Sequence, residues 1–397
     1  MGAHSIVAIR TVAISDPTTR LRRKVWKLSF HPSLTVENTM TKNISRRSAL
    51  GFAAKSAGIA GAASVAMSVN APLAQAAPQL DDLLPNAWNT IAASQGDQFP
   101  EIQAALDRAE EEGGGIVYLE SGTFQIGNTL NIGENVTLEG AGAATRLRAI
   151  GSMPWMVQFP ASSFLGVLRN IRLFGGGSVG GVNIATAGTG TFSGRDSYVL
   201  VENVTIHDVA FNGVRVGTFT QGFGTREVRL HNVVVLRAQS HGILFLGVDS
   251  IISNCTVAGS GFDGFHIDGG NNRLTGCKAF FCTGSGFTVN GSRGQLSACQ
   301  SQDNEGDGFK IDNANDVALS ACGADSNQFV GVRIRNCQAV TFSSASSISR
   351  GGGRFTQRFG VRIQDSSNCR ITGVSNNNST NLNVTNSPTV DISGLLS

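Results

Sequence analysis

The segment from Asp263 to Asp312, DGFHIDGGNNRLTGCKAFFCTGSGFTVNGSRGQLSACQSQDNEGDGFKID, repeats itself about every 22 residues. It contains DGFHID from Asp263, SGFTVN from Ser285 and DGFKID from Asp307. In each copy a glycine is followed by alternating apolar and polar residues, and this alternation predicts a short strand with one buried face. A unit that returns at a fixed period predicts a solenoid, in which neighbouring units stack to bury a continuous core.

The same pattern continues on both sides of this segment. Its glycines are separated by 29, 22, 22, 22, 23 and 29 residues, and they are Gly213, Gly242, Gly264, Gly286, Gly308, Gly331 and Gly360. A second set of small apolar residues repeats in step with them, at Cys255, Cys277, Cys299 and Cys322. A coil of about 22 residues is too short for a four-stranded blade but accommodates three short strands. We therefore expect an all-β, parallel β-helix with coils ~4.8 Å apart along its axis.

A resemblance to a known superfamily lies before the repeats. Residues 99–147, FPEIQAALDRAEEEGGGIVYLESGTFQIGNTLNIGENVTLEGAGAATRL, resemble the opening of the pectate-lyase-like right-handed parallel β-helix superfamily. The resemblance implies a right-handed, single-stranded β-helix with an N-terminal capping helix at about residues 99–111, and an enzyme site on the outer wall. The capping helix also follows from its apolar face of Ile102, Ala105, Leu106 and Ala109. The superfamily includes lyases, hydrolases, epimerases, phage spikes and adhesins, so the resemblance leaves the reaction open.

The N-terminal part has the features of an export signal. Residues 40–76 resemble a twin-arginine signal peptide, with Arg46 and Arg47 before a weakly apolar stretch and a small-residue cleavage site ending at Ala76. Residues 1–39 are interpreted as an over-extended gene start, and residues 77–397 as the β-helix domain. We expect a secreted or periplasmic protein that uses the twin-arginine machinery and keeps no permanent membrane anchor. Since such cargo folds in a reducing cytoplasm, its seven cysteines should be free thiols.

The charge of the β-helix domain limits its partners. Residues 77–397 contain 21 Lys and Arg against 26 Asp and Glu, a net charge of −5. A nucleic-acid partner is therefore not expected, because phosphate binding needs a basic surface. No cofactor is expected either: the sequence has no C-x-x-C pair for zinc, and although Asp residues near turns could hold calcium, no dense Asp-x-Asp run supports such a site.

Candidate site residues gather on the outward face of the glycine strands. The candidate catalytic residues are His266, Asp268, Lys310 and Asp312, and the candidate substrate-binding residues are Asp263, Asp307, Arg333, Arg335 and His241. Two longer units place insertions near residues 217–228 and 345–357, which we expect to wall this face into a groove. Lys310 and Arg333 lie one coil apart, so their charges repel unless an anion binds between them.

This arrangement predicts activity on an acidic polysaccharide. Removal of a proton next to a uronate carboxylate, as in a lyase or an epimerase, requires a cation, a base and an acid. Glycoside hydrolysis is the other possibility, because Asp268 and Asp312 are two coils apart, roughly 9.6 Å along the axis. A non-catalytic glycan-binding or adhesin-like β-helix is the alternative. In it, the exposed Lys, Arg and Asp side chains would form ordinary cross-strand contacts, an interpretation that applies to Lys310 with Asp312 and to Arg333 with Arg335.

Aromatic side chains are expected to contribute little to binding. Most phenylalanines, such as Phe265, Phe287 and Phe309, fall on inward positions, and few tryptophans and tyrosines remain. Charge and hydrogen bonds would then have to hold the ligand.

Overall fold

The computed structural model describes residues 89–185, 197–217 and 225–396. By its contacts the chain divides into residues 1–75 and 76–397, and all described residues belong to the second unit. The predicted gene-start extension and twin-arginine signal therefore lie outside the described residues.

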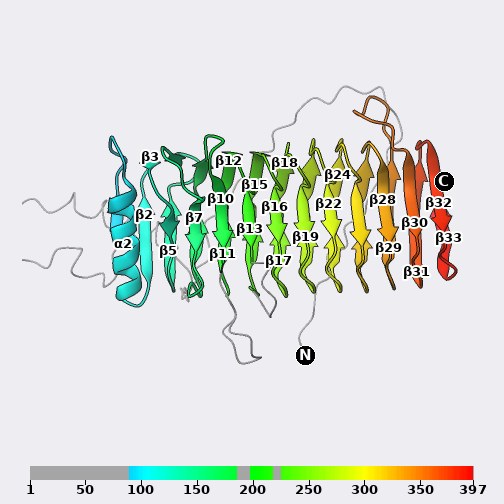
Figure 1. The fold of residues 1–397 in the computed structure, drawn as a ribbon, viewed down its shortest axis with the longest axis horizontal. Helices are drawn as coiled ribbons and strands as arrows, with labels where there is room; N and C mark the ends of the chain where they lie inside the picture. The colour runs from blue at the N-terminus through cyan, green and yellow to red at the C-terminus, as the bar shows by residue number, and fades with distance from the viewer. Residues whose placement is uncertain (1–88, 186–196, 218–224, 397) are drawn as a thin grey trace, which may run out of the picture. The chain divides into compact units, whose positions relative to one another are not determined.

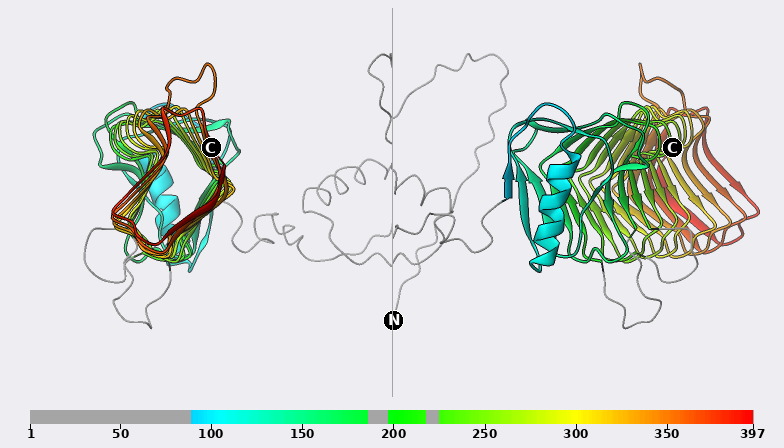
Figure 2. Two further views of the ribbon diagram at one scale, coloured as in Figure 1. Left: turned by 90° about the vertical axis from the view of Figure 1, so that its right-hand side faces the viewer. Right: turned by 60° about the vertical axis from the view of Figure 1, so that its left-hand side comes forward.

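The described unit is a right-handed parallel β-helix (Figure 1). Each coil contributes short strands to three columns, and each strand pairs in parallel with the strands one coil before and one coil after it. The view along the axis in Figure 2 shows the coils superimposed around one interior. The predicted fold class is confirmed.

The three columns account for most of the strands. The first column contains β1 (Asn89–Ile91), β2 (Gly115–Leu119), β5 (Val136–Gly140), β8 (Val167–Arg169), β11 (Leu200–Glu202), β14 (Arg229–His231), β17 (Ile251–Ser253), β20 (Arg273–Thr275), β23 (Gln295–Ser297) and β26 (Ala318–Ser320). The second contains β3 (Gly122–Ile126), β6 (Thr145–Ala149), β9 (Arg172–Phe174), β12 (Thr205–Val209), β15 (Val234–Ala238), β18 (Thr256–Ala258), β21 (Lys278–Phe280), β24 (Gln300–Gln302) and β27 (Gly323–Asp325). The third, which holds the glycine strands, contains β4 (Leu130–Asn131), β7 (Trp155–Phe159), β10 (Gly180–Ile184), β13 (Val214–Val216), β16 (Ile243–Phe245), β19 (Phe265–Ile267), β22 (Phe287–Val289), β25 (Phe309–Asp312), β28 (Val330–Arg335), β30 (Phe359–Gln364) and β32 (Thr380–Thr385).

Longer strands complete the last coils. They are β29 (Thr341–Ile348), β31 (Cys369–Asn376) and β33 (Val390–Leu396). The start of β29 pairs with β26 and its end pairs with β27, so this strand joins the first two columns into one.

Helix α2 (Phe99–Glu111) covers the N-terminal end of the coils. Its second residue is Pro100, which suits the first turn of a helix because no intrahelical N–H is needed there. Its predicted apolar face is buried, with Ile102 and Leu106 almost fully inaccessible. The helix contacts β2, β4 and β5, so it excludes water from the open end of the core.

Identical residues stack inside the solenoid. The rings of Phe265 and Phe287 lie parallel with centroids 4.7 Å apart, and those of Phe287 and Phe309 lie 4.9 Å apart. These spacings match the distance between coils, as the repeat predicts. All seven cysteines are buried and free, in agreement with the expected free thiols.

Close approach between columns explains the repeated glycine. A Cβ on Gly264 would lie 2.7 Å from the Cβ of Ala279 in the second column and 2.7 Å from the carbonyl oxygen of Gly286. A Cβ on Gly242 would lie 2.2 Å from a methyl carbon of Val257. Only glycine therefore lets the third column begin this close to the second.

Left-handed residues make the turn between the first two columns. Asn203, Asn232 and Asn254 occupy this turn on successive coils with φ of 54°, 51° and 54°. Asparagine tolerates this conformation better than most residues do. Its amide also bonds along the stack, since Asn232 Nδ2 donates to Asn203 Oδ1 at 2.8 Å.

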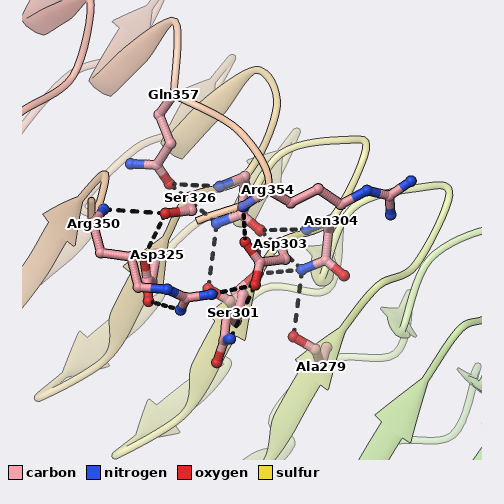
Figure 3. A network of polar contacts seen from close by, with 11 residues as sticks. Ala279, Ser301, Asp303, Asn304, Asp325, Ser326, Arg350, Arg354 and Gln357 are labelled. Atoms are coloured by element: carbon pink, nitrogen blue, oxygen red, sulfur yellow. Dashed lines mark hydrogen bonds and ion pairs between the residues drawn. The ribbon is translucent and has the colours of Figure 1, made fainter. Parts of the chain in front are cut away.

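The predicted second insertion is present as a loop between β29 and β30, and it is fixed to the two preceding coils (Figure 3). Arg350 forms ion pairs with both Asp303 and Asp325. The backbone N–H of Arg354 donates to Asp303 Oδ1 at 2.8 Å. The loop thus has a defined position beside the start of the third column. The other predicted insertion falls largely on residues 218–224, outside the described residues, so the walled groove stays a prediction.

Replacing Phe287 with alanine should destabilise the solenoid, because it removes the middle ring of the buried stack. We expect the Phe287→Ala change to lower the free energy of unfolding by about 3–5 kcal/mol. Urea denaturation followed by circular dichroism measures this change. The matched control is Phe281→Ala, which removes a half-exposed ring of the same size. Equal losses in the two variants would contradict the stacking argument.

Candidate functional site

Four predicted site residues form one cluster on the outer face of the third column. This histidine cluster consists of His241, Asp263, His266 and Asp268. His266 projects outward from β19, where its neighbours Phe265 and Ile267 point into the core. Its Nδ1 lies 2.8 Å from Asp263 Oδ2, and its Nε2 lies 3.1 Å from Asp268 Oδ1. Both nitrogens of His266 are therefore held by carboxylates.

These two hydrogen bonds, called the carboxylate clamp, determine the charge of His266. Burial disfavours the protonated imidazole, but the hydrogen bonds to Asp263 and Asp268 outweigh it and raise the pKa of His266 to about 9. The same bonds lower the pKa of both carboxyl groups. At Asp263, burial is the largest effect and opposes the lowering, but the hydrogen bonds outweigh it. At Asp268, the bond to His266 is the largest effect. His266 is thus a cation at neutral pH.

His241 has the opposite properties. Its ring lies beside that of His266, with centroids 4.6 Å apart, and its Nδ1 is 3.8 Å from Asp263 Oδ2. This Nδ1 is buried and makes no hydrogen bond. Burial, followed by repulsion from His266, lowers the pKa of His241 below 6.5. A neutral imidazole therefore lies next to a charged one.

The third column also carries a row of cations three coils long. This cation row consists of Lys310, Arg333 and Arg362, which are directly paired on β25, β28 and β30. Among the described residues, the ion pairs of this face join Asp307 with Arg333 and leave Lys310 without one. The guanidinium of Arg362 lies over the ring of Phe359, 5.0 Å from its centroid. Like charges directly opposite on neighbouring strands repel, so the row favours an anion on this surface.

The acidic residues near the row are buried rather than exposed. Asp307 and Asp312 are each only 4% exposed, which corrects the expectation of outward, accessible carboxylates. Burial raises the pKa of Asp307, although the nearby Arg333 opposes this shift. Asp312 forms a bidentate ion pair with Arg335 and not with Lys310. The expected pair of Lys310 with Asp312 is therefore wrong: Asp312 pairs with Arg335, which lies at the matching position of the next coil.

One coil separates the two groups, so the predicted site residues do not all meet. On this coil, the backbone N–H of Ser285 donates to Asp263 Oδ1 at 2.8 Å, and Asn290 Nδ2 donates to Asp268 Oδ1 at 2.7 Å. On its other side, the N–H of Asp307 donates to Ser285 Oγ at 3.3 Å. The intervening coil thus fixes the acids of the histidine cluster and connects them to the cation row.

Exposed aromatic residues border this face, outside the inward positions expected for most phenylalanines. Phe211, Phe262 and Phe329 are 47–58% exposed and lie two residues before the glycines of their coils. The ring of Phe262 is 5.5 Å from that of His241, centroid to centroid. Because all three phenylalanines precede the glycine by two residues, the sequence repeat itself indicated that they occupy the same place on their respective coils. Exposed rings here offer apolar area to a sugar face.

The histidine cluster also has residues of the types that hold metals. One ligand atom each from His241, Asp263 and His266 lies within 4.8 Å of the others. A metal would have to displace the proton that His266 Nδ1 shares with Asp263 Oδ2. Metal binding at this cluster would therefore compete with the hydrogen bond between His266 and Asp263.

Comparisons with known proteins agree with the architecture. The sequence family described as right handed beta helix region matches residues 220–354. No curated protein sequence matches the chain. The A-module of the Azotobacter vinelandii mannuronan C-5 epimerase AlgE6 is similar in structure, with a TM-score of 0.59, 18% identity, and coverage of 77% of this chain and 96% of that module.

Two further structures have different activities in their names. The enzymatically active domain of bacteriophage CBA120 tailspike protein 2 has a TM-score of 0.60 and 14% identity, over 74% of this chain and 50% of that chain. The endo-xylogalacturonan hydrolase from Aspergillus tubingensis has a TM-score of 0.51 and 11% identity, over 78% of this chain and 94% of that chain. Such distant similarity establishes the fold alone. Within the described ranges, no helix is long and apolar enough to cross a membrane.

Stability should decrease as the pH rises from 6.5 to about 9, because His266 then loses its proton. The unfolded chain releases this proton near 6.5 and the folded chain near 9. The contribution of His266 is therefore complete below pH 6.5 and is lost through pH 9, with a value of up to about 3 kcal/mol. Folding lowers the pKa values of His241, Asp263 and Asp268. These groups therefore change the stability only at pH values below the pKa that each has in the unfolded chain.

Urea unfolding across this pH range measures the loss, and an NMR titration of the imidazole signals should place the His266 midpoint at about 9. The His266→Gln variant should lack the decrease. His231→Gln, in which a histidine of the first column is replaced, should keep it. A His266 midpoint near 6.5 would show that the two carboxylates do not hold the proton.

Proposed function

We propose that the protein is an exported enzyme that acts on an acidic polysaccharide and removes the proton next to a uronate carboxylate. The observation that carries this proposal is the contact between His241 and the doubly clamped His266, on the same face as the cation row. Proton abstraction of this kind is the step that lyases and epimerases share. The epimerase and hydrolase named above support a polysaccharide as the class of substrate.

His241 would act as the base. An imidazole accepts a proton only when neutral, and burial together with the charge of His266 favours that form. Two neighbouring groups whose pKa values are pushed apart are the usual sign of divided acid and base roles. In addition, the Nδ1 atom of His241 makes no hydrogen bond.

His266 would keep the base in its neutral form, because its positive charge disfavours protonation of the neighbouring His241. Because both of its nitrogens are bonded to carboxylates, its ring is fixed before substrate binds. Asp263 and Asp268 would act as positioning residues that keep His266 protonated and oriented.

The cation row and the exposed rings would bind the remaining sugar units. Lys310 and Arg333 would receive carboxylates of units beyond the reacting one, and Phe262 would contact the face of a sugar next to His241. Arginine and carboxylate form strong bidentate pairs, which suits repeated acidic groups.

Hydrolysis by Asp268 and Asp312 has less support. Asp312 is bound to Arg335 through both carboxylate oxygens, and Asp268 bonds to both His266 and Asn290. A general acid needs a raised pKa, whereas the bond to His266 lowers that of Asp268.

A non-catalytic glycan-binding protein is the second candidate. The unpaired Lys310 beside Arg333 favours it, since a cation row can hold an acidic glycan without any chemistry. In both cases, we propose export through the twin-arginine signal in residues 40–76, followed by action in the periplasm or outside the cell.

Replacing His241 with glutamine should reduce turnover of the correct polysaccharide by about 10²–10⁴-fold, because a general base contributes this much. With increasing pH, the rate of the unchanged enzyme should first rise, because His241 loses its proton at a pH below 6.5. It should then fall near pH 9, where His266 loses its proton. Incubation with alginate, pectate and glucuronan in deuterated water tests this. Ultraviolet absorbance of unsaturated uronate reports a lyase, and deuterium at C5 without absorbance reports an epimerase.

The control for this experiment is His231→Gln, which should retain full turnover and the same pH profile. Circular dichroism should show that the His241→Gln variant is folded. New reducing ends without absorbance or deuterium would identify a hydrolase and contradict proton abstraction. Turnover abolished by EDTA and restored by zinc or calcium would show that the histidine cluster holds a metal. Retention of a polysaccharide without turnover would favour the binder.

Replacing Lys310 with alanine should weaken binding of an acidic polysaccharide about tenfold and reduce its salt dependence, because one ionic contact is lost. Isothermal titration calorimetry at two salt concentrations measures both effects. Lys278→Ala is the control, since Lys278 projects from the second column. Unchanged affinity in the Lys310→Ala variant would exclude the cation row from binding.

A further inference from the structure

A pocket of about 340 Å³ lies on the outer face of the second column, near the N-terminal end of the coils. Its lining residues come from β3, β6, β9 and β12 and from the turn that follows β9. Those used below are Arg146, Arg148, Arg172, Phe174 and Asp208. The pocket is built by other strands than the histidine cluster and the cation row, so it is a separate site.

Strand register brings three guanidinium groups to this pocket. Arg146 on β6 is directly paired with Arg172 on β9. Arg148 lies two residues after Arg146, on the same outward side of β6, while Leu147 between them is fully buried. Equal charges directly opposite on neighbouring strands are unfavourable in the empty protein.

No carboxylate neutralises these three arginines among the described residues. The acid in the pocket lining, Asp208, is bound to Arg237 through both oxygens, at 2.6 Å and 2.9 Å. The ion pairs of the described ranges include none to Arg146, Arg148 or Arg172. The pocket therefore has a strong excess of positive charge.

Two buried nitrogens in this region also lack partners. Arg172 Nε makes no hydrogen bond although it is inaccessible to solvent, and the same holds for His207 Nε2. Buried polar atoms in folded proteins are nearly always bonded, so the Nε of Arg172, a lining residue of the pocket, is a donor available to a ligand. His207 stacks on Phe174 with ring centroids 4.5 Å apart and an angle of 3° between the planes. This stack fixes the ring of Phe174 in the pocket wall.

We propose that this pocket binds the carboxylate or sulfate group of a single anionic sugar unit. The three arginines would bind the oxyanion, since guanidinium groups match its planar donor and acceptor geometry. Phe174 would supply an apolar contact for the sugar ring. The volume falls in the range of pockets for small ligands. The site would hold a branch or a distant part of a polysaccharide, or a free acidic saccharide.

The test measures binding by calorimetry to the exported protein carrying Lys310→Ala and Arg333→Gln, which removes binding by the cation row. The probes are a trisaccharide of galacturonate, a neutral trisaccharide of galactose, and inorganic sulfate. We expect the acidic trisaccharide to bind, and Arg172→Gln added to this background to weaken that binding at least tenfold. Arg229→Gln, an exposed change in the first column, should leave it unchanged.

Each outcome is decisive because folding is monitored by thermal unfolding in every variant. Failure of the acidic trisaccharide to bind, or equal affinity in the Arg172→Gln variant, would overturn the site. Sulfate binding as tightly as the trisaccharide would overturn the sugar assignment and identify a site for a free oxyanion. Neither result affects the proposed chemistry at His241, which is measured separately by turnover.

Discussion

Parallel pairing between successive coils is the constraint on which the rest of the structure depends. Each strand must lie ~4.8 Å from its equivalent in the next coil, so every side chain meets the residue of the same position one repeat later. For apolar and amide groups this is favourable: Phe265, Phe287 and Phe309 stack as parallel rings, and Asn203 bonds to Asn232. For charged groups of one sign the same geometry is unfavourable, because no displacement along the strand can separate them.

Positions where like charges do lie opposite each other on adjacent coils therefore indicate candidate binding sites for anions. Opposite charges on adjacent coils form ion pairs, as Arg335 with Asp312 and Arg333 with Asp307 show. Like charges nevertheless face each other directly between Lys310, Arg333 and Arg362, and between Arg146 and Arg172. Local rules of stability are commonly broken at functional sites. Both places proposed to bind acidic sugars were identified by unresolved repulsion between coils, and the two are on different columns.

The fold was predictable because it depends on periodicity, which a sequence displays directly. Alternation after each glycine fixed which residues face the core, and the apolar face of Ile102 and Leu106 located the capping helix. Side-chain partners were not predictable in the same way. The choice of Arg335 rather than Lys310 by Asp312 depends on reach between coils. The contact of His241 with His266 joins a turn residue to a strand residue, and their opposite pKa shifts arise from burial that no spacing encodes.

The separation of the histidine cluster from the cation row bears on how a polymer would lie. Lys310 is two coils beyond His266, roughly 9.6 Å along the axis, and Arg362 is two coils further. Groups at such regular intervals match a chain that runs parallel to the solenoid axis, with successive acidic units over successive coils. The reacting unit would then lie at His241, and the units bound by Lys310 and Arg333 would all lie on one side of it. Binding energy from those remote units would orient the reacting one, a use of binding that raises the rate rather than the affinity alone.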